Sequence, residues 1–205
     1  YSGLWSVDLG ASGLTFNYPY AKEHNLTAMK GIETISGGAG GTVNEKDVRF
    51  KKIELAGFVI SNPRISFPIR EVKGGLSSKD FIGNAGNSLF RHFVLYLDYE
   101  NQQVIVEKGA DFGRTFPENN SGLSLIYNDK GLIEVFYIIP GSAADKAGFK
   151  KGDILKNING VSAEDYPDLV KLRELFYKEP GTTYTAKIKR QGKILELKLT
   201  LFSLF

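Results

Sequence analysis

The chain has 205 residues, more than one typical domain of about 100–150 residues and enough for two modest hydrophobic cores. Its 26 Lys and Arg residues against 23 Asp and Glu residues leave a formal net charge of +3, and the two halves are equally balanced, which argues against nucleic acid as a partner. The absence of Cys excludes disulfides, thiolate nucleophiles and Cys-based zinc sites.

Residues 1–108 contain short apolar runs separated by Gly and Asn, a pattern typical of a mostly-β fold with minor α-helix. The clearest predicted strands are residues 4–9, 48–60, 65–69 and 93–107. Two short helices are expected at residues 18–25 and 87–92. Residues 109–120 then lose periodicity and collect Gly, Pro, Asn and Ser, which indicates a linker. We therefore predict two domains, 1–116 and 117–205.

The second half has a different pattern of elements. Strands are predicted at residues 124–127, 133–138, 154–158, 184–190 and 194–201. A short helix is expected between Ser142 as its N-cap and Gly148 as its C′ glycine. A longer helix is expected at residues 166–176, because apolar side chains recur there at i, i+3 and i+7.

The segment PGSAADKAGFKKGDILKNING, residues 140–160, resembles the core signature of bacterial protease-associated PDZ domains. Such domains add an extended peptide as a strand to the edge of their sheet. Residues 121–125, Ser-Gly-Leu-Ser-Leu, are similar to the family's loop that holds a peptide carboxylate with backbone N–H groups. The resemblance implies a peptide-binding set of Gly122, Leu123, Ser124, Leu125, Leu169, Leu172 and Phe176. The alternative is that these apolar side chains are simply core.

The first half carries a second resemblance. Residues 6–16, SVDLGASGLTF, are similar to the active-site turn of retropepsin-like aspartic peptidases, in which a carboxylate activates water as general base. The resemblance implies a retropepsin-like acid-protease β-barrel lobe with Asp8 as the catalytic residue and Gly10, Ala11 and Gly86 as active-site support. Residues 81–93, followed by Leu-Asp-Tyr at 97–99, are similar to the closing pattern of such a lobe, with Asn84 replacing an apolar residue.

A glycine-rich segment, residues 36–42, falls where the aspartic-peptidase family places a flexible hairpin flap over its substrate. The implied flap residues are Gly37, Gly38, Gly40 and Gly41. A phosphate-binding loop is the rival interpretation, but no Gly-Lys-Ser/Thr follows.

The chain also departs from the aspartic-peptidase pattern. Leu9 stands where the family has Thr or Ser, and the sequence holds one such turn only. A second aspartic lobe would have to come from an upstream segment or from a homodimer, and the abrupt strand-like start at Tyr1 favours a missing upstream segment. The competing interpretation makes Asp8 a hydrogen-bonded turn residue of an inactive lobe.

Other sites have little support in the sequence. His24 and His92 lie far from any Gly-x-Ser-x-Gly elbow, and no residue cluster suggests a metal or another cofactor. We therefore expect an aspartic-type endopeptidase, or its C-terminal lobe, whose PDZ domain binds a peptide or protein substrate. The alternative is an inactive peptide-binding adaptor, and a tail-specific serine protease fragment is a third class. The resemblance implies an extracytoplasmic location, periplasmic or secreted, and we expect no membrane span in the chain.

Overall fold

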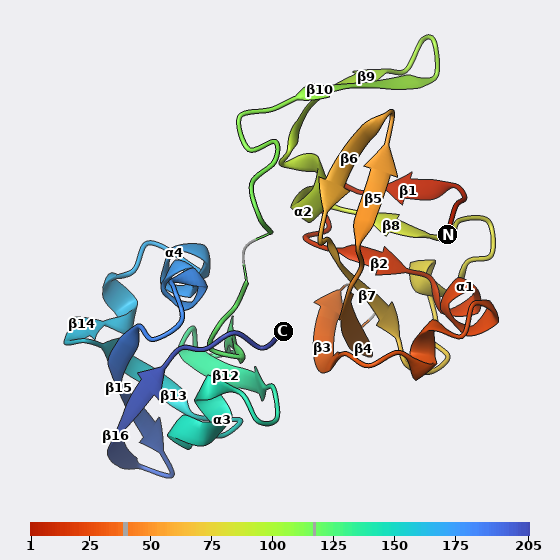
Figure 1. The fold of residues 1–205 in the computed structure, drawn as a ribbon. Helices are drawn as coiled ribbons and strands as arrows, with labels where there is room; N and C mark the ends of the chain where they lie inside the picture. Colours follow the sequence, from red (N-terminus) through yellow and green to blue (C-terminus); the bar gives the residue numbers. More distant parts are fainter. Residues whose placement is uncertain (39–40, 117) are drawn as a thin grey trace. The chain divides into compact units, whose positions relative to one another are not determined.

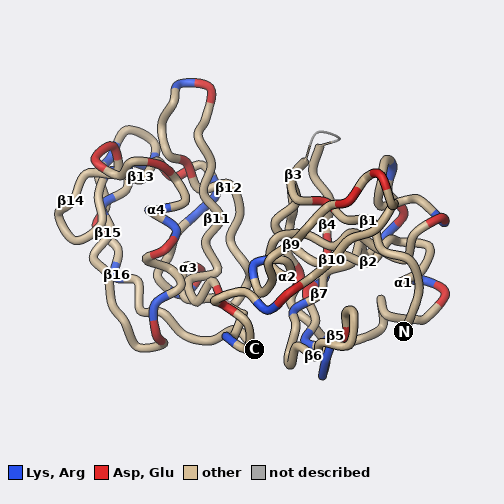
Figure 2. The backbone as a smooth tube through the Cα atoms, turned by 90° about the horizontal axis from the view of Figure 1, so that it is seen from above, with Lys and Arg blue, Asp and Glu red and all other residues tan. Residues whose placement is uncertain are grey.

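The computed structural model describes residues 1–38, 41–116 and 118–205. The chain forms two compact units, Tyr1–Phe116 and Pro117–Phe205, and each unit has a hydrophobic core of its own (Figure 1). Both units are mostly β with few helices. Basic and acidic positions are interspersed along the backbone of both units (Figure 2).

The N-terminal unit is built on a six-stranded sheet with the strand order β1-β8-β2-β7-β4-β3. These strands are β1 (Trp5–Val7), β2 (Leu14–Phe16), β3 (Ile32–Gly38), β4 (Gly41–Arg49), β7 (Arg64–Pro68) and β8 (Gly83–Ala85). Two short helices accompany the sheet, α1 (Tyr18–Glu23) and α2 (Asn87–Phe90), with two 3-10 turns at Leu26–Ala28 and Gly75–Ser77. The core of the unit lies on the face that carries Phe16, Val48, Ile65 and Phe67.

Two further hairpins belong to this unit. β5 (Lys52–Leu55) pairs with β6 (Phe58–Ser61), and β9 (Phe93–Asp98) pairs with β10 (Gln103–Lys108). The predicted strand at residues 48–60 is therefore wrong as one strand, because Ala56 and Gly57 adopt positive φ and turn the chain between β5 and β6. The predicted run at 93–107 is likewise a hairpin rather than one strand.

The C-terminal unit contains one antiparallel sheet in the order β11-β12-β13-β15-β16, with β14 paired to β13. Its strands are β11 (Leu123–Tyr127), β12 (Ile133–Ile138), β13 (Ile154–Ile158), β14 (Val161–Ser162), β15 (Thr183–Arg190) and β16 (Lys193–Thr200). The helices are α3 (Ala143–Ala147) and α4 (Leu169–Glu174), with 3-10 turns η3 (Ala163–Asp165) and η4 (Leu175–Tyr177).

The helix expected at residues 166–176 begins later than predicted. Pro167 disfavours helical conformation in the residue before it, and Tyr166 is extended, with ψ of 133°. Asp168 then caps α4, because its carboxylate accepts a hydrogen bond from the Lys171 N–H at 2.8 Å. The short helix α3 has the expected caps, since Ser142 accepts from the Asp145 N–H and Gly148 adopts φ of +87°.

An ion pair between the buried Asp153 and the partly exposed Arg190 fixes the turn before β13. The Asp153 side chain is 1 % exposed and accepts hydrogen bonds from Arg190 Nε at 2.6 Å and from the Lys150 N–H at 2.8 Å. The same guanidinium donates to the carbonyl of Gly148, which ends α3. Arg190 on β15 thus connects the end of α3 to the start of β13.

Candidate functional site

The first candidate site is the outer edge of β11 in the C-terminal unit. β11 pairs with β12 on one side, and no strand of the described residues pairs with its other edge. The Leu125 and Leu123 carbonyls point to that edge, since both accept hydrogen bonds from side chains outside the sheet. An edge of this kind can accept an additional strand through main-chain hydrogen bonds.

Asn119 occupies the N-terminal end of this edge. Its side-chain oxygen accepts hydrogen bonds from the N–H groups of Ser121 at 3.0 Å and Gly122 at 3.1 Å. Its amide nitrogen donates to the Leu123 carbonyl at 2.9 Å. The Leu123 N–H is also held, because it donates to the Ser121 hydroxyl at 2.9 Å. The backbone groups of the loop therefore already have side-chain partners.

Arg173 occupies the next acceptor along the edge. Its guanidinium extends from α4 and donates to the carbonyl of Leu125. Sequence reasoning missed both Asn119 and Arg173. A signal for Arg173 existed, because it lies at i+4 from Leu169 and i−3 from Phe176, which places all three on one face of the helix.

Apart from Gly122, the residues predicted to bind the peptide lie in β11, α4 and η4, and they differ in exposure. Leu123, Leu125, Leu172 and Phe176 are at most 2 % exposed and belong to the hydrophobic core of the unit. Leu169 and Ser124 are partly buried. The apolar side chains thus form a closed core under the edge, and the edge itself carries backbone groups, Asn119 and Arg173.

Gly122 has no room for a side chain. It adopts φ of +69°, and a Cβ atom at this position would lie 2.2 Å from the Cβ of Ser142. Ser142 is fully buried and caps α3, so it cannot move aside. Gly122 therefore holds the start of β11 directly against the start of α3.

The Asp8 turn forms a second polar cluster, in the N-terminal unit. The Asp8 carboxylate accepts hydrogen bonds from the N–H groups of Gly10 at 2.9 Å and Ala11 at 3.1 Å, and from the Asn84 amide at 3.0 Å. The Asn84 bond, followed by the backbone bonds, holds the pKa of Asp8 below its ordinary value. Asn84, which the sequence marked only as replacing an apolar residue, also accepts from the Ser6 hydroxyl at 2.9 Å.

Gly86 packs against the same turn. A Cβ atom on Gly86 would lie 2.5 Å from the carbonyl oxygens of both Ala11 and Gly13, so the two segments approach at backbone distance. The Asn87 N–H donates to the Ala11 carbonyl and the Ser88 N–H to the Ser12 carbonyl, at 2.9 and 2.8 Å. The hydrogen bonds to the Asp8 carboxylate within the described residues come from Gly10, Ala11 and Asn84, and none comes from another carboxyl group.

The glycine-rich segment contains the end of β3 and the start of β4, which pair with each other. Gly38 pairs with Gly41 at the tip of the β3–β4 hairpin, Gly37 precedes them, and all three are exposed. The predicted flap residue Gly40 lies outside the described residues. Nothing within 4 Å would meet a Cβ atom at Gly37, Gly38 or Gly41, so close packing does not explain these glycines.

The two histidines do not form a serine triad with the residues that the structure describes. His92 is 1 % exposed and its Nδ1 lies 2.8 Å from the carbonyl of Asp111, while the His24 ring stacks on Tyr20 at 4.1 Å. The described residues also contain no group of three or more His, Asp or Glu side chains that could hold a metal ion. Within that same part of the chain, no helix is both long and apolar enough to cross a membrane.

Glu45 is the buried carboxyl group of the N-terminal sheet with the largest change in acidity. It is 5 % exposed on β4, and burial raises its pKa to about 7 from the ordinary 4.5, against the opposing hydrogen bond from Ser36 and with a smaller contribution from Asp47. Asp47, on the same face of β4, accepts from the Ser66 hydroxyl at 2.7 Å and lies 3.5 Å from Arg64. Asp47 therefore has a hydroxyl donor and a cation beside its carboxylate, while burial, which raises the Glu45 pKa to about 7, favours the protonated form of Glu45 below that pH.

We expect the N-terminal unit to lose stability as the pH rises from about 4.5 to about 7, because the folded state holds a proton on Glu45 that the unfolded state releases. A pKa difference of this size corresponds to about 3 kcal/mol in the free energy of unfolding. Urea denaturation followed by the fluorescence of Trp5, the single Trp of the chain, measures this unit. Glu45→Gln is expected to remove most of the pH dependence, whereas Glu54→Gln, at an exposed glutamate, should retain it. Equal pH dependence in wild type and Glu45→Gln would show that Glu45 is not the responsible group.

Comparison with known proteins identifies the C-terminal unit. Residues 113–201 match the family model of the PDZ domain. A curated relative, the periplasmic pH-dependent serine endoprotease DegQ of Escherichia coli (strain K12), is 38 % identical over 64 residues, which are 31 % of this chain and 14 % of DegQ. The chain therefore matches only a small part of that relative. The PDZ family model, over residues 113–201, covers β11, α4 and the loop before β11, so the edge described above is that of a PDZ domain.

Three solved structures resemble the chain at low sequence identity and low TM-score. The photosystem II D1 C-terminal processing protease is 23 % identical with a TM-score of 0.39, over 42 % of this chain and 23 % of its own. The HtrA-type protease AlgW with decapeptide is 15 % identical with a TM-score of 0.32, over 41 % and 28 %. A serine endoprotease from Yersinia pestis is 14 % identical with a TM-score of 0.41, over 98 % and 67 %. Because these TM-scores are below 0.5, we base no argument on them.

The curated relative corrects the predicted family of the whole chain. DegQ is a serine endoprotease and not an aspartyl protease. The prediction of a retropepsin-like aspartyl protease is therefore contradicted, and we assign no catalytic role to Asp8. The turn resemblance extended over eleven residues, and a carboxylate bound by two N–H groups and an amide is also an ordinary way to stabilise a tight turn.

Proposed function

We propose that this chain is a peptide-binding protein in which the PDZ domain captures an extended peptide on the free edge of β11. The single observation that supports this function is the unpaired edge of β11, bordered by α4, in a PDZ domain. The peptide pairs antiparallel to β11, with its terminal carboxylate at the N–H groups of Ser121, Gly122 and Leu123. Gly122 keeps its N–H in this loop by fitting directly against Ser142.

Binding requires the peptide to replace three side chains of the protein. The carboxylate takes the N–H groups of Ser121 and Gly122 from Asn119, and the N–H of Leu123 from the Ser121 hydroxyl. A peptide N–H takes the Leu125 carbonyl that Arg173 now holds. The side chain of the last peptide residue lies toward Leu123, Leu125 and Phe176, which must separate slightly to admit it because they are buried in the unbound domain. The proposed groove is thus closed until a ligand with both groups enters.

A binding experiment tests the proposal. A library of peptides with free C-termini is screened against the full chain, and the best binder is measured by fluorescence anisotropy as the free acid and as the C-terminal amide. We expect the amide to bind at least about tenfold more weakly, since charge-assisted hydrogen bonds to the carboxylate are lost. Equal binding of acid and amide would contradict carboxylate capture, and mass spectrometry of the same mixture would reveal any cleavage.

Arg173→Met is expected to strengthen peptide binding about three- to tenfold, because the peptide no longer has to displace a charged donor from the Leu125 carbonyl. The matched control is Lys171→Met, which removes a cation of the same helix that pairs with Glu174 at 2.9 Å and lies away from Leu125. Isothermal titration of one peptide against both variants gives the comparison. Weaker binding by Arg173→Met alone would instead mean that the guanidinium contacts the peptide.

We further propose that the chain acts outside the cytoplasm. The support is the curated relative, which is described as periplasmic and is 38 % identical to this chain over 64 residues. Cell fractionation of the source organism, with an antibody against the chain, tests the location. Recovery of the chain with the cytoplasmic fraction would reject it.

A further inference from the structure

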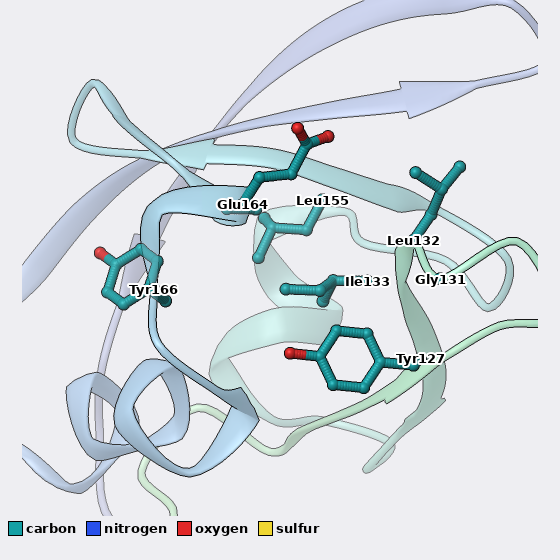
Figure 3. A pocket seen from close by; sticks show the side chains of 8 residues that line it. Tyr127, Gly131, Leu132, Ile133, Leu155, Glu164 and Tyr166 are labelled. Atoms are coloured by element: carbon teal, nitrogen blue, oxygen red, sulfur yellow. The ribbon is translucent and has the colours of Figure 1, made fainter.

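A cavity lies at the far end of the proposed groove from the carboxylate loop. Its volume is about 190 Å³, and it opens beside the last residue of β11 (Figure 3). The side chains that form it and that matter here are Tyr127, Ile133, Leu155, Ala163, Glu164 and Tyr166. We call it the distal pocket.

The distal pocket has an apolar floor and aromatic walls. Ile133, Leu155 and Ala163 are 6 %, 2 % and 3 % exposed and belong to the hydrophobic core, so the floor of the pocket is the surface of that core. Figure 3 shows the rings of Tyr127 and Tyr166 on either side of Ile133 and Leu155, with the carboxylate of Glu164 turned away from them. A dry cavity of about 150 Å³ lined by apolar side chains is large enough to bind benzene, so a ring or a branched aliphatic side chain fits a pocket of this size.

Charge does not dominate the distal pocket. Glu164 is 72 % exposed at the rim and lies 3.6 Å from Lys156, and an exposed pair of this kind contributes little. Glu164 is the only formally charged residue among those that line the pocket, and its partner Lys156 does not line it. The pocket therefore favours an apolar ligand over an ionic one.

The geometry of β11 connects the pocket to the edge. Side chains alternate along a strand, so Leu123, Leu125 and Tyr127 lie on one face, and the Leu123 and Leu125 carbonyls point to the free edge. The pairing of β11 with β12 skips Phe136, so the extra residue is in β12 and the alternation of β11 is intact. The edge positions of β11 therefore continue regularly to Tyr127.

We propose that the distal pocket binds a large apolar side chain, aromatic or branched aliphatic, of a peptide residue upstream of the carboxyl terminus. This inference rests on the proposed function of the edge. In an antiparallel pair, the peptide residue opposite Tyr127 is two positions upstream of the residue opposite Leu125. Its side chain lies on the same face as Tyr127, next to the pocket. The PDZ domain then reads two separated peptide side chains, one at the terminus and one upstream.

The test is an alanine scan of the best free-acid peptide against the full chain, which needs no protein variant. We expect one upstream position at which alanine weakens binding about tenfold, in addition to the loss at the terminal residue. An upstream segment that tolerates alanine everywhere, while the terminal residue remains essential, would overturn the distal pocket and leave the proposed function intact. Failure of every peptide to bind would overturn the proposed function itself.

Protein variants locate the upstream contact. Ala163→Leu fills the pocket from its floor and Tyr166→Ala removes a wall, while Tyr177→Ala changes an exposed tyrosine that does not line the pocket. Circular dichroism first checks that each variant is folded, and Tyr166→Ala serves if the larger residue at 163 disturbs the core. In either pocket variant we expect the upstream alanine effect to fall below about twofold, and in Tyr177→Ala to stay near tenfold. An upstream effect that persists in a folded pocket variant would place that contact elsewhere and overturn the inference.

Discussion

Replacing Gly122 by alanine is expected to destabilise the C-terminal unit by about 3 kcal/mol or more. The residue adopts φ of +69°, which costs a side-chain-bearing residue roughly 1–2 kcal/mol. The added Cβ would also lie 2.2 Å from the Cβ of the buried Ser142, and overpacking of a closed core adds roughly 1–3 kcal/mol. Hydrogen exchange of the amides of β11 to β13, measured by mass spectrometry on the full chain, reports the stability of this unit.

Gly192→Ala is the matched control for the backbone contribution. Gly192 has φ of +82° in the turn between β15 and β16, and nothing within 4 Å would meet its Cβ. Only the conformational cost applies, so we expect a loss of about 1 kcal/mol. Equal losses at the two glycines would mean that the contact between the start of β11 and Ser142 does not constrain the fold.

Arg190→Met is expected to destabilise the same unit by about 3–5 kcal/mol. The substitution leaves the Asp153 carboxylate 1 % exposed without its cation, and an uncompensated buried charge is far more costly than a missing surface pair. It also removes the donor to the Gly148 carbonyl at the end of α3. Urea denaturation followed by far-ultraviolet circular dichroism, together with hydrogen exchange of β13, measures the loss.

Two comparisons separate the ion pair from the loss of any basic side chain. Lys189→Met changes the neighbouring exposed cation of β15 and should alter the free energy of unfolding by less than about 0.5 kcal/mol. The double variant Asp153→Asn with Arg190→Met should recover part of the loss, because the buried charge is gone. An Arg190→Met variant as stable as wild type would mean that the ion pair with Asp153 does not stabilise the unit.

The PDZ domain could be predicted because its signature combines several local constraints. The segment at residues 140–160 contains a cap, a helix end, a glycine turn and an apolar strand in fixed order, and each residue there serves the local structure in which it lies. The predicted start of the long helix failed at Pro167, whose effect on Tyr166 outweighed the apolar spacing of the helix. The apolar period alone was not sufficient to place a helix boundary.

The state of the groove could not be predicted from the sequence. Asn119 and Arg173 lie 54 positions apart in the chain, and their hydrogen bonds to the edge of β11 depend on how α4 and the loop fold onto it. The sequence offered the side-chain types but not the contacts. The same limit applies to the predicted aspartyl-protease family, because the short turn motif at Asp8 fits a catalytic site and a structural turn equally well.

The side chains that cover β11 have a further consequence for the protein when no ligand is present. An unpaired edge strand exposes a row of N–H and C=O groups to which any other strand can add, and such edges initiate aggregation. Asn119 and Arg173 satisfy part of that row, so a passing strand gains few hydrogen bonds unless it also brings the groups that displace them. Asn119 and Arg173 therefore limit the addition of a foreign strand to the edge of β11 that the proposed ligand would use.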